Sequence, residues 1–188
     1  MKILKLSIAI AAIITVISCG SSSNDQAANK EGFTSIENEI KDKFGVDAYY
    51  TDLKIINIQP IGNVVSTTVT EAPESMKMGE WDLNQGTWKQ NSEITLEVPE
   101  GSKASDFMFQ LDEKISLSKL GELVEKSMKQ LTTEKSIENP ALSLAFIKFP
   151  KNGAIAETEY AIKLEPENGG TSFSFYYTLE GDLIKMDY

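Results

Sequence analysis

Residue types that often carry chemistry are missing or nearly missing from this sequence of 188 residues. It contains no histidine and no arginine, and its only cysteine is Cys19. Without histidine, the chain lacks the commonest general base at neutral pH and the usual ligand of zinc and copper. A single cysteine excludes a disulfide framework. Ser-His-Asp and Cys-His mechanisms are therefore excluded by composition.

The sequence is also poor in positive charge. It has 18 lysines against 28 aspartates and glutamates, a formal net charge of −10. Phosphate binding needs clustered cations, and arginine makes most of the bidentate contacts to bases. We therefore expect no nucleic-acid partner. An acidic surface is repelled by anionic lipid, so membrane attachment is expected from acyl chains and not from a basic protein face.

The segment Met1 to Cys19 carries the clearest motif. Lys2 and Lys5 precede a nearly unbroken apolar run from Leu6 to Ile17. This run is shorter than the roughly 20 residues of a membrane-spanning helix, which favours a cleaved signal peptide. Its end, Val16-Ile17-Ser18-Cys19, resembles the lipobox of bacterial lipoproteins. The resemblance implies a signal peptide over residues 1–18 and lipidation of Cys19, with a diacylglycerol thioether and palmitate-type acyl chains.

The residues after Cys19 bear on where the anchor would place the protein. The start Cys-Gly-Ser-Ser-Ser-Asn-Asp is similar to that of Bacteroidetes lipoproteins. By resemblance to the enterobacterial sorting rule, the lack of an aspartate directly after the cysteine argues against the inner membrane. We expect a lipid-anchored protein of the cell envelope, in the outer membrane, on its periplasmic or cell-surface face. Residues 19–32, small and polar, are expected to form a flexible tether.

Residues 33–188 predict a single α+β domain. Thr34 and Glu37 have capping-box spacing and predict a helix over 35–44, while apolar residues at helical spacing predict a second helix over 118–131. Runs rich in branched and alternating apolar residues predict strands. These runs are 53–58, 64–70, 76–83, 87–91, 93–98, 106–111, 142–149, 154–164, 171–179 and 182–188. We expect an antiparallel sheet with the helices packed on one face.

The predicted elements repeat along the chain. Residues 33–98 and 104–188 both contain a helix followed by antiparallel strands, and Pro99-Glu-Gly-Ser-Lys103 separates them. This order resembles the tandem helix-plus-sheet arrangement of the beta-lactamase inhibitor proteins and of PepSY-like domains, without a shared sequence motif. The resemblance implies a curved sheet whose face opposite the helices is free for a partner. It implies no chemistry, because a fold does not fix a function.

Aromatic residues on predicted strands are the candidate contacts with a ligand or partner. They are Trp81, Trp88, Tyr49 and Tyr50. Flat rings on a sheet can stack on sugars or anchor a protein partner, and core packing is the alternative. No catalytic residue, metal ligand or cofactor is assigned.

These observations predict a non-catalytic binding or interaction module, with a protein or a glycan as its partner. The alternative is an envelope hydrolase that uses carboxylates or a Ser-Lys pair. The one local pattern for that alternative is Ser116-Leu-Ser-Lys119, which has the Ser-x-x-Lys spacing of penicillin-interacting enzymes.

Overall fold

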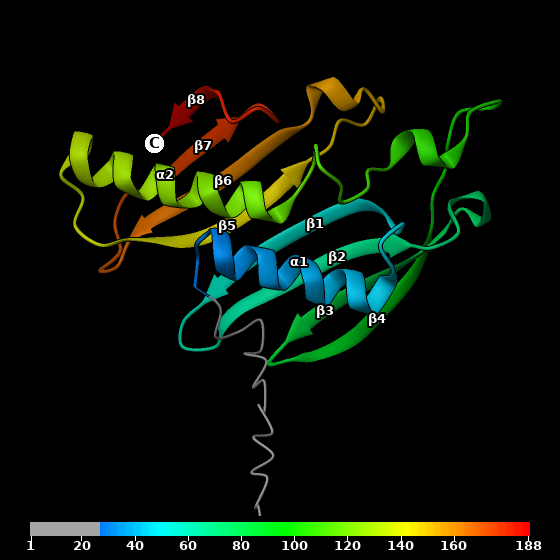
Figure 1. The fold of residues 1–188 in the computed structure, drawn as a ribbon, viewed down its shortest axis with the longest axis horizontal. Coiled ribbons are helices and arrows are strands. Elements are labelled where there is room, and N and C mark those ends of the chain that lie inside the picture. The colour runs from blue at the N-terminus through cyan, green and yellow to red at the C-terminus, as the bar shows by residue number, and fades with distance from the viewer. Residues whose placement is uncertain (1–26) are drawn as a thin grey trace, which may run out of the picture.

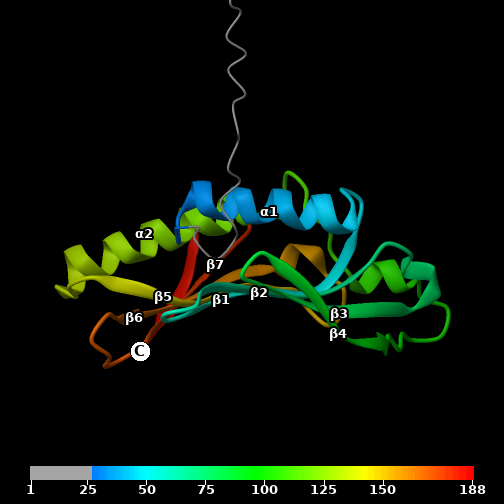
Figure 2. The ribbon, with the colours of Figure 1, turned by 90° about the horizontal axis from the view of Figure 1, so that it is seen from below.

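The computed structural model describes residues 27–188, which form one eight-stranded antiparallel sheet and two long helices. Both helices lie on the same side of the sheet (Figure 1, Figure 2). The α+β prediction, with an antiparallel sheet covered by helices on one face, is confirmed. The elements are α1 Lys30–Phe44, β1 Tyr49–Ile58, β2 Gly62–Thr70, η2 Pro73–Ser75, β3 Lys77–Asn84, β4 Thr87–Thr95, η3 Ala104–Phe107, α2 Leu117–Lys135, β5 Pro140–Lys148, η4 Ile155–Glu157, β6 Glu159–Pro166, β7 Phe173–Tyr177 and β8 Leu183–Asp187.

The order of the elements is the same in the two halves of the described chain. Each long helix is followed by four strands, β1 to β4 after α1 and β5 to β8 after α2. The strand order across the sheet is β4-β3-β2-β1-β5-β6-β7-β8, so the first strand of each half lies at the centre. These two strands meet through only three residue pairs, Lys54–Phe146, Ile55–Ala145 and Ile56–Leu144. We call this contact the seam.

The hydrophobic core lies between the helices and the sheet. Ile55, Ala145 and Ile162 are buried there and lie opposite one another on adjacent strands. Side chains at alternate positions of a strand point to the same side, so one side of each central strand supplies the core. From α1, Ile36 and Ile40 reach the same core with helical spacing.

The two helices touch directly where each begins. A Cβ atom on Gly121 of α2 would lie 2.5 Å from the carbonyl oxygen of Asn29, so only glycine allows this approach. Close by, Glu37 of α1 accepts a hydrogen bond from the backbone N–H of Leu117, the first residue of α2, with an N–O distance of 2.6 Å. Its other carboxylate oxygen accepts one from the Lys41 ammonium group, also at 2.6 Å. One side chain of the first half therefore caps the helix of the second half.

This arrangement corrects the predicted start of the first helix. Helix α1 begins at Lys30, and its N-cap is Asn29, whose side chain accepts from the N–H of Gly32. The capping box of Thr34 and Glu37 was therefore wrong. The Thr34 hydroxyl donates to the Lys30 carbonyl, as a residue inside the first turn can. Residues 30–32, assigned to the tether, belong to the helix.

Three strand predictions also differ from the structure. The run 87–91 and the first part of the run 93–98 belong to one strand, β4, which ends at Thr95 and has a register shift at Asn91 opposite Glu80 and Trp81. The predicted strand 106–111 is instead η3 followed by one isolated bridge between Phe109 and Tyr50. The run 154–164 begins with η4 before β6 starts at Glu159. In each case, the alternation of apolar and polar residues did not indicate the bulge or the short helix.

Candidate functional site

The sheet has one face that the two long helices leave uncovered. Cross-strand partners lie on the same face, so the register identifies its side chains. Across the seam, Ile56 of β1 lies opposite Leu144 of β5, and two positions along β5, Phe146 lies opposite Ala161 of β6. Apolar residues that are linked across the seam in this way are Val64, Ile56, Leu144, Phe146, Ala161 and Tyr176. We call this set the apolar stripe.

The stripe runs from β2 to β7 and joins the two halves of the molecule. Apart from Ala161, which is 2% exposed, its members are half-buried, shielded by their neighbours in the sheet and not by a helix. Its largest side chains, Phe146 and Tyr176, lie on a hydrogen-bonded sheet. An apolar surface of this kind, set among polar residues, is typical of a site where a partner docks.

Ion pairs flank the apolar stripe. Four of them lie on the uncovered face: Asp52–Lys54, Lys148–Glu159, Lys163–Glu165 and Lys185–Asp187, with N–O distances from 2.7 to 3.2 Å. Two of these lysines also lie over the ring of Tyr176, with Nζ 4.4 Å from the ring centroid for Lys185 and 5.5 Å for Lys148. Tyr176 is therefore held in place by cations while part of its surface stays accessible. An apolar centre with a charged rim is the anatomy of a protein–protein interface.

One corner of the uncovered face is closed by the segment that links the two halves. Met78 of β3 is 1% exposed and packs with Ala104 and Met108 from this segment. Tyr49 and Ile94 lie against the same cluster. The accessible part of the face is thus centred on the seam and on the second half.

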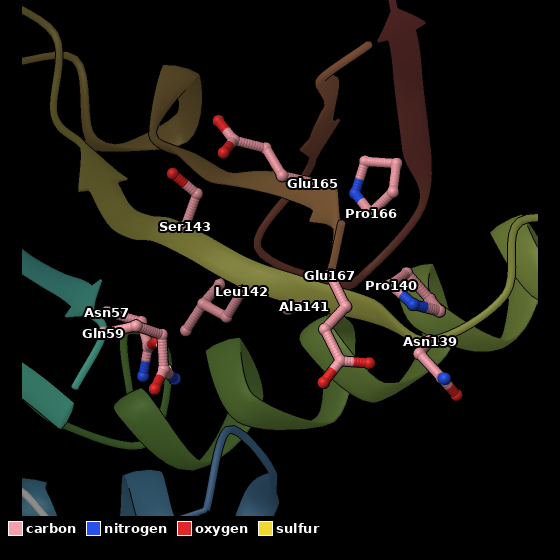
Figure 3. Close-up of a pocket in the computed structure, with 10 residues that line it drawn as sticks. All are labelled: Asn57, Gln59, Asn139, Pro140, Ala141, Leu142, Ser143, Glu165, Pro166 and Glu167. Carbon is pink, nitrogen blue, oxygen red and sulfur yellow. Dashed lines mark hydrogen bonds between the residues drawn. The ribbon is translucent and has the colours of Figure 1, made fainter. Parts of the chain in front are cut away.

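At one end of the seam, a cleft of about 730 Å³ opens between β1 and β5 (Figure 3). We call it the seam cleft. Asn57 and Gln59 lie on its β1 side, and Leu142 and Ser143 lie on its β5 side. The remaining lining residues are Asn139, Pro140, Ala141, Glu165, Pro166 and Glu167. The volume lies within the range of about 300–1,000 Å³ that is usual for ligand sites.

The two tryptophans proposed from the sequence lie on the helix-covered face. Trp88 is opposite Leu83, which is buried in the core, and Trp81 is opposite Thr67. Both rings pack edge-on against Phe44 at the end of α1, with centroid distances of 5.5 Å for Trp81 and 4.9 Å for Trp88. They are half-buried and extend the core, so they do not line the uncovered face.

The two tyrosines have different positions. Tyr50 is 1% exposed and lies in the core, where burial, with a smaller contribution from the charge of Glu37, raises the pKa of its hydroxyl. Its ring therefore offers no surface to a partner. Tyr49 is half-buried under the linking segment. Cys19, the predicted lipidation site, lies outside the described residues.

The apolar stripe was not found from the sequence, although a signal for it exists. Leu53–Ile58 and Leu142–Phe149 have apolar residues on both alternating sets of positions. A strand that is apolar on both sides is buried on both sides or has an uncovered apolar face. The sequence does not distinguish these two cases, because the number of helices that cover a sheet is a property of the fold.

Little in the described residues suggests metal or nucleophilic chemistry. Within 27–188, no group of three or more histidine, cysteine, aspartate or glutamate side chains could hold a metal ion. Ser116 is the N-cap of α2, and its hydroxyl accepts from the N–H of Lys119. The Lys119 ammonium group pairs with Glu122 at 3.0 Å. In the Ser-x-x-Lys pattern, Ser116 therefore caps a helix and Lys119 forms a surface ion pair.

The comparisons with known proteins give no family for this chain. No helix in the described part is long and apolar enough to cross a membrane. No family model matches the sequence, and neither a curated protein nor a solved structure matches the chain.

Proposed function

We propose that this protein is a lipid-anchored component of the bacterial cell envelope that acts by binding a protein partner through the uncovered face of its sheet. The anchor is Cys19, by the resemblance of residues 1–18 to a lipoprotein signal peptide, and the expected location is the outer membrane. The binding role is non-catalytic and needs no cofactor.

The observation that carries the binding role is the apolar stripe. Phe146 and Tyr176 are large, half-buried side chains on the sheet face opposite the two long helices (Figure 2). Aromatic residues of this kind are enriched among those that dominate binding energy, and a rim of charged residues excludes water around them. The ion pairs around Tyr176 fit such a rim.

A protein partner fits this surface better than a glycan does. Sugars bind flat rings beside many free hydrogen-bonding groups, whereas the charged groups that surround the stripe are already paired with one another. The stripe is also longer than one ring, because it crosses from β2 to β7 over the seam.

The test uses the full-length lipidated chain, purified with its partners from detergent-solubilised native envelope. A double variant, Phe146→Ser with Tyr176→Ser, is compared with a control, Val46→Ser with Ile155→Ser. The control removes two apolar side chains that are exposed elsewhere, at 67% and 47%. The partner should be lost only from the double variant, while thermal denaturation shows that both proteins are folded. Retention of the same partner by both variants contradicts the proposal.

The anchor is tested separately by feeding cells an alkyne analogue of palmitate. The wild-type chain should be labelled, and Cys19→Ala should not be. Equal labelling of the two proteins contradicts lipidation at Cys19 and leaves the binding proposal to its own test.

A further inference from the structure

We propose that the seam cleft binds an extended, positively charged peptide, which adds to β5 as a further strand. This site goes beyond the proposed function, because it lies at the end of the seam and uses residues outside the apolar stripe. Four observations support it: the unequal pairing of β5, the way the other end of the seam is filled, the charge of the lining, and the lack of aromatic rings in it.

The first observation is the pairing of β5. Toward β6, this strand is paired from Pro140 to Lys148. Toward β1, it is paired only at residues 144–146. In the described part of the chain, residues 140–143 have no strand partner on that side. They span about 13 Å, at roughly 3.3 Å per residue. Pro140 has no N–H to donate, and a register shift between Leu142 and Leu144 interrupts the regular pairing at Ser143, so the main-chain donors of this edge are those of residues 141–143. Unpaired edges of this type are templates on which an extended peptide can pair.

The second observation is at the opposite end of the seam, where the chain fills the equivalent gap itself. Phe109, from the segment that links the two halves, forms an antiparallel bridge with Tyr50 of β1. The two residues exchange backbone hydrogen bonds with N–O distances of 2.8 and 2.9 Å. The ring of Phe109 packs against those of Tyr50 and Phe149, the latter directly after β5. An extended segment of polypeptide therefore fits between β1 and β5 where they separate.

The third observation is the charge of the cleft. Glu165 and Glu167 are the only charged residues among its ten lining residues, and none of the ten is a cation. Glu165 pairs with Lys163 at 3.1 Å, and both side chains are 41% exposed. Glu167 is exposed, and its backbone N–H is bonded to the carbonyl of Asn139. Lys163 already pairs with Glu165, but no cation among the ten lining residues offsets Glu167, so the lining is net negative and favours lysine or arginine on the peptide.

The fourth observation separates a peptide from a sugar. Asn139 and Ser143 could bind either ligand through hydrogen bonds, whereas the Gln59 amide donates to Asn57 at 3.1 Å and the Asn57 amide donates to Asn63 at 2.9 Å. However, none of the lining residues is aromatic, so the cleft has no flat ring on which a sugar could stack. The unpaired strand edge supplies main-chain groups, which a peptide can match along its length and a sugar cannot.

The experiment screens the full-length protein in detergent against a positional-scanning library of acetylated, amidated octapeptides, read by fluorescence anisotropy. We expect lysine or arginine to be selected at alternate positions, because alternate side chains of a strand point to the same side. The best peptide is then remade with N-methyl groups on alternate backbone amides, in both phases. One of the two N-methylated forms should lose at least tenfold in affinity, since it cannot donate to β5.

Variants locate the site. Ala141 is exposed and lines the cleft, so Ala141→Trp should block binding without unfolding the protein. Glu165→Lys with Glu167→Lys should reverse the preference toward acidic peptides. The control, Glu100→Lys with Glu134→Lys, makes the same change in net charge at two exposed glutamates outside the cleft and should bind like wild type.

Other results overturn the inference. They are selection of no peptide, equal binding by both N-methylated forms, full binding by Ala141→Trp, or binding of glycans in place of peptides. Loss of the partner in Phe146→Ser with Tyr176→Ser, with peptide binding unchanged, would show that the stripe and the cleft are separate sites. The two proposals can thus fail independently.

Discussion

Three buried tyrosines allow one chemical change to be tested in three environments. Tyr50, Tyr160 and Tyr177 are each at most 1% exposed, and replacing any of them by phenylalanine removes only the hydroxyl. The hydroxyl of Tyr50 has no hydrogen-bond partner in the described structure. That of Tyr160 accepts from the N–H of Ser116 at 2.9 Å, and that of Tyr177 is 2.8 Å from the hydroxyl of Ser127.

The three substitutions should therefore change the free energy of unfolding differently, one raising it and two lowering it. A buried hydroxyl without a partner costs about 1–3 kcal/mol, so Tyr50→Phe should stabilise the protein by about 1 kcal/mol after the loss of packing. Tyr160→Phe leaves the Ser116 N–H without its acceptor and should destabilise by about 1–2 kcal/mol. Tyr177→Phe should cost less, because Ser127 still donates to the carbonyl of Leu123 at 2.8 Å.

Urea denaturation at neutral pH, followed by circular dichroism, measures the free energy of unfolding of all three variants. The expected order of stability is Tyr50→Phe, wild type, Tyr177→Phe and Tyr160→Phe, from highest to lowest. For a domain of this size, 1 kcal/mol corresponds to about 2–4 °C in Tm. Destabilisation by Tyr50→Phe of more than about 0.5 kcal/mol would instead mean that the Tyr50 hydroxyl has a hydrogen-bond partner.

Three further predictions concern pH, the contact between the halves and a tight turn. Burial raises the pKa of Tyr160 from 10.0 to about 12, so its contribution to stability is intact below pH 10 and is lost as the pH rises through 12, by up to roughly 3 kcal/mol. Burial also raises the pKa of Tyr50 and of Tyr177, so urea titrations at pH 8 to 12 should show a fall in stability that Tyr160→Phe makes smaller but does not abolish. Glu37→Leu leaves the buried N–H of Leu117 without an acceptor and should lower the free energy of unfolding, measured in urea, by about 2–3 kcal/mol. Glu37→Gln can still accept this hydrogen bond and should cost about 1 kcal/mol. Equal losses would contradict the capping role of Glu37. Gly153 has φ +75°, and a Cβ atom there would lie 2.1 Å from the Asp106 carbonyl oxygen, whereas Gly169 has φ +79° and open space around it. Gly153→Ala should therefore lower Tm clearly more than Gly169→Ala does. Similar shifts in Tm would contradict the close approach of Gly153 to Asp106.

The sequence predicted the local elements well where a single periodicity ran uninterrupted. Helix α2 and strands β1, β2 and β5 follow from apolar residues at helical spacing or from branched runs between turns. The repeated order of a helix and several strands followed from the same patterns. The pattern of each of these elements is contained in a short stretch of sequence, so predicting them required no knowledge of contacts between distant residues.

Features that depend on contacts far apart in the sequence could not be predicted. Glu37 has capping-box spacing within its own helix, yet its carboxylate caps Leu117, 80 residues further along. Phe109 alternates with its neighbours like a strand residue, but only one bridge, to Tyr50, forms. The seam cleft exists because β1 and β5 pair over three residues and no more, and this extent of pairing is decided by the packing of the two halves. The tryptophans were proposed as contacts because side-chain type alone does not say which face of a sheet is covered.

The most direct test of the binding role places a photo-crosslinking amino acid at single positions of the full-length protein in intact cells. Position 176 lies on the uncovered face, and position 129 lies on the exposed side of α2. We expect a specific crosslinked protein from position 176 and none from position 129. The same adduct from both positions, or an adduct from position 129 alone, would contradict the claim that the partner docks on the uncovered face of the sheet.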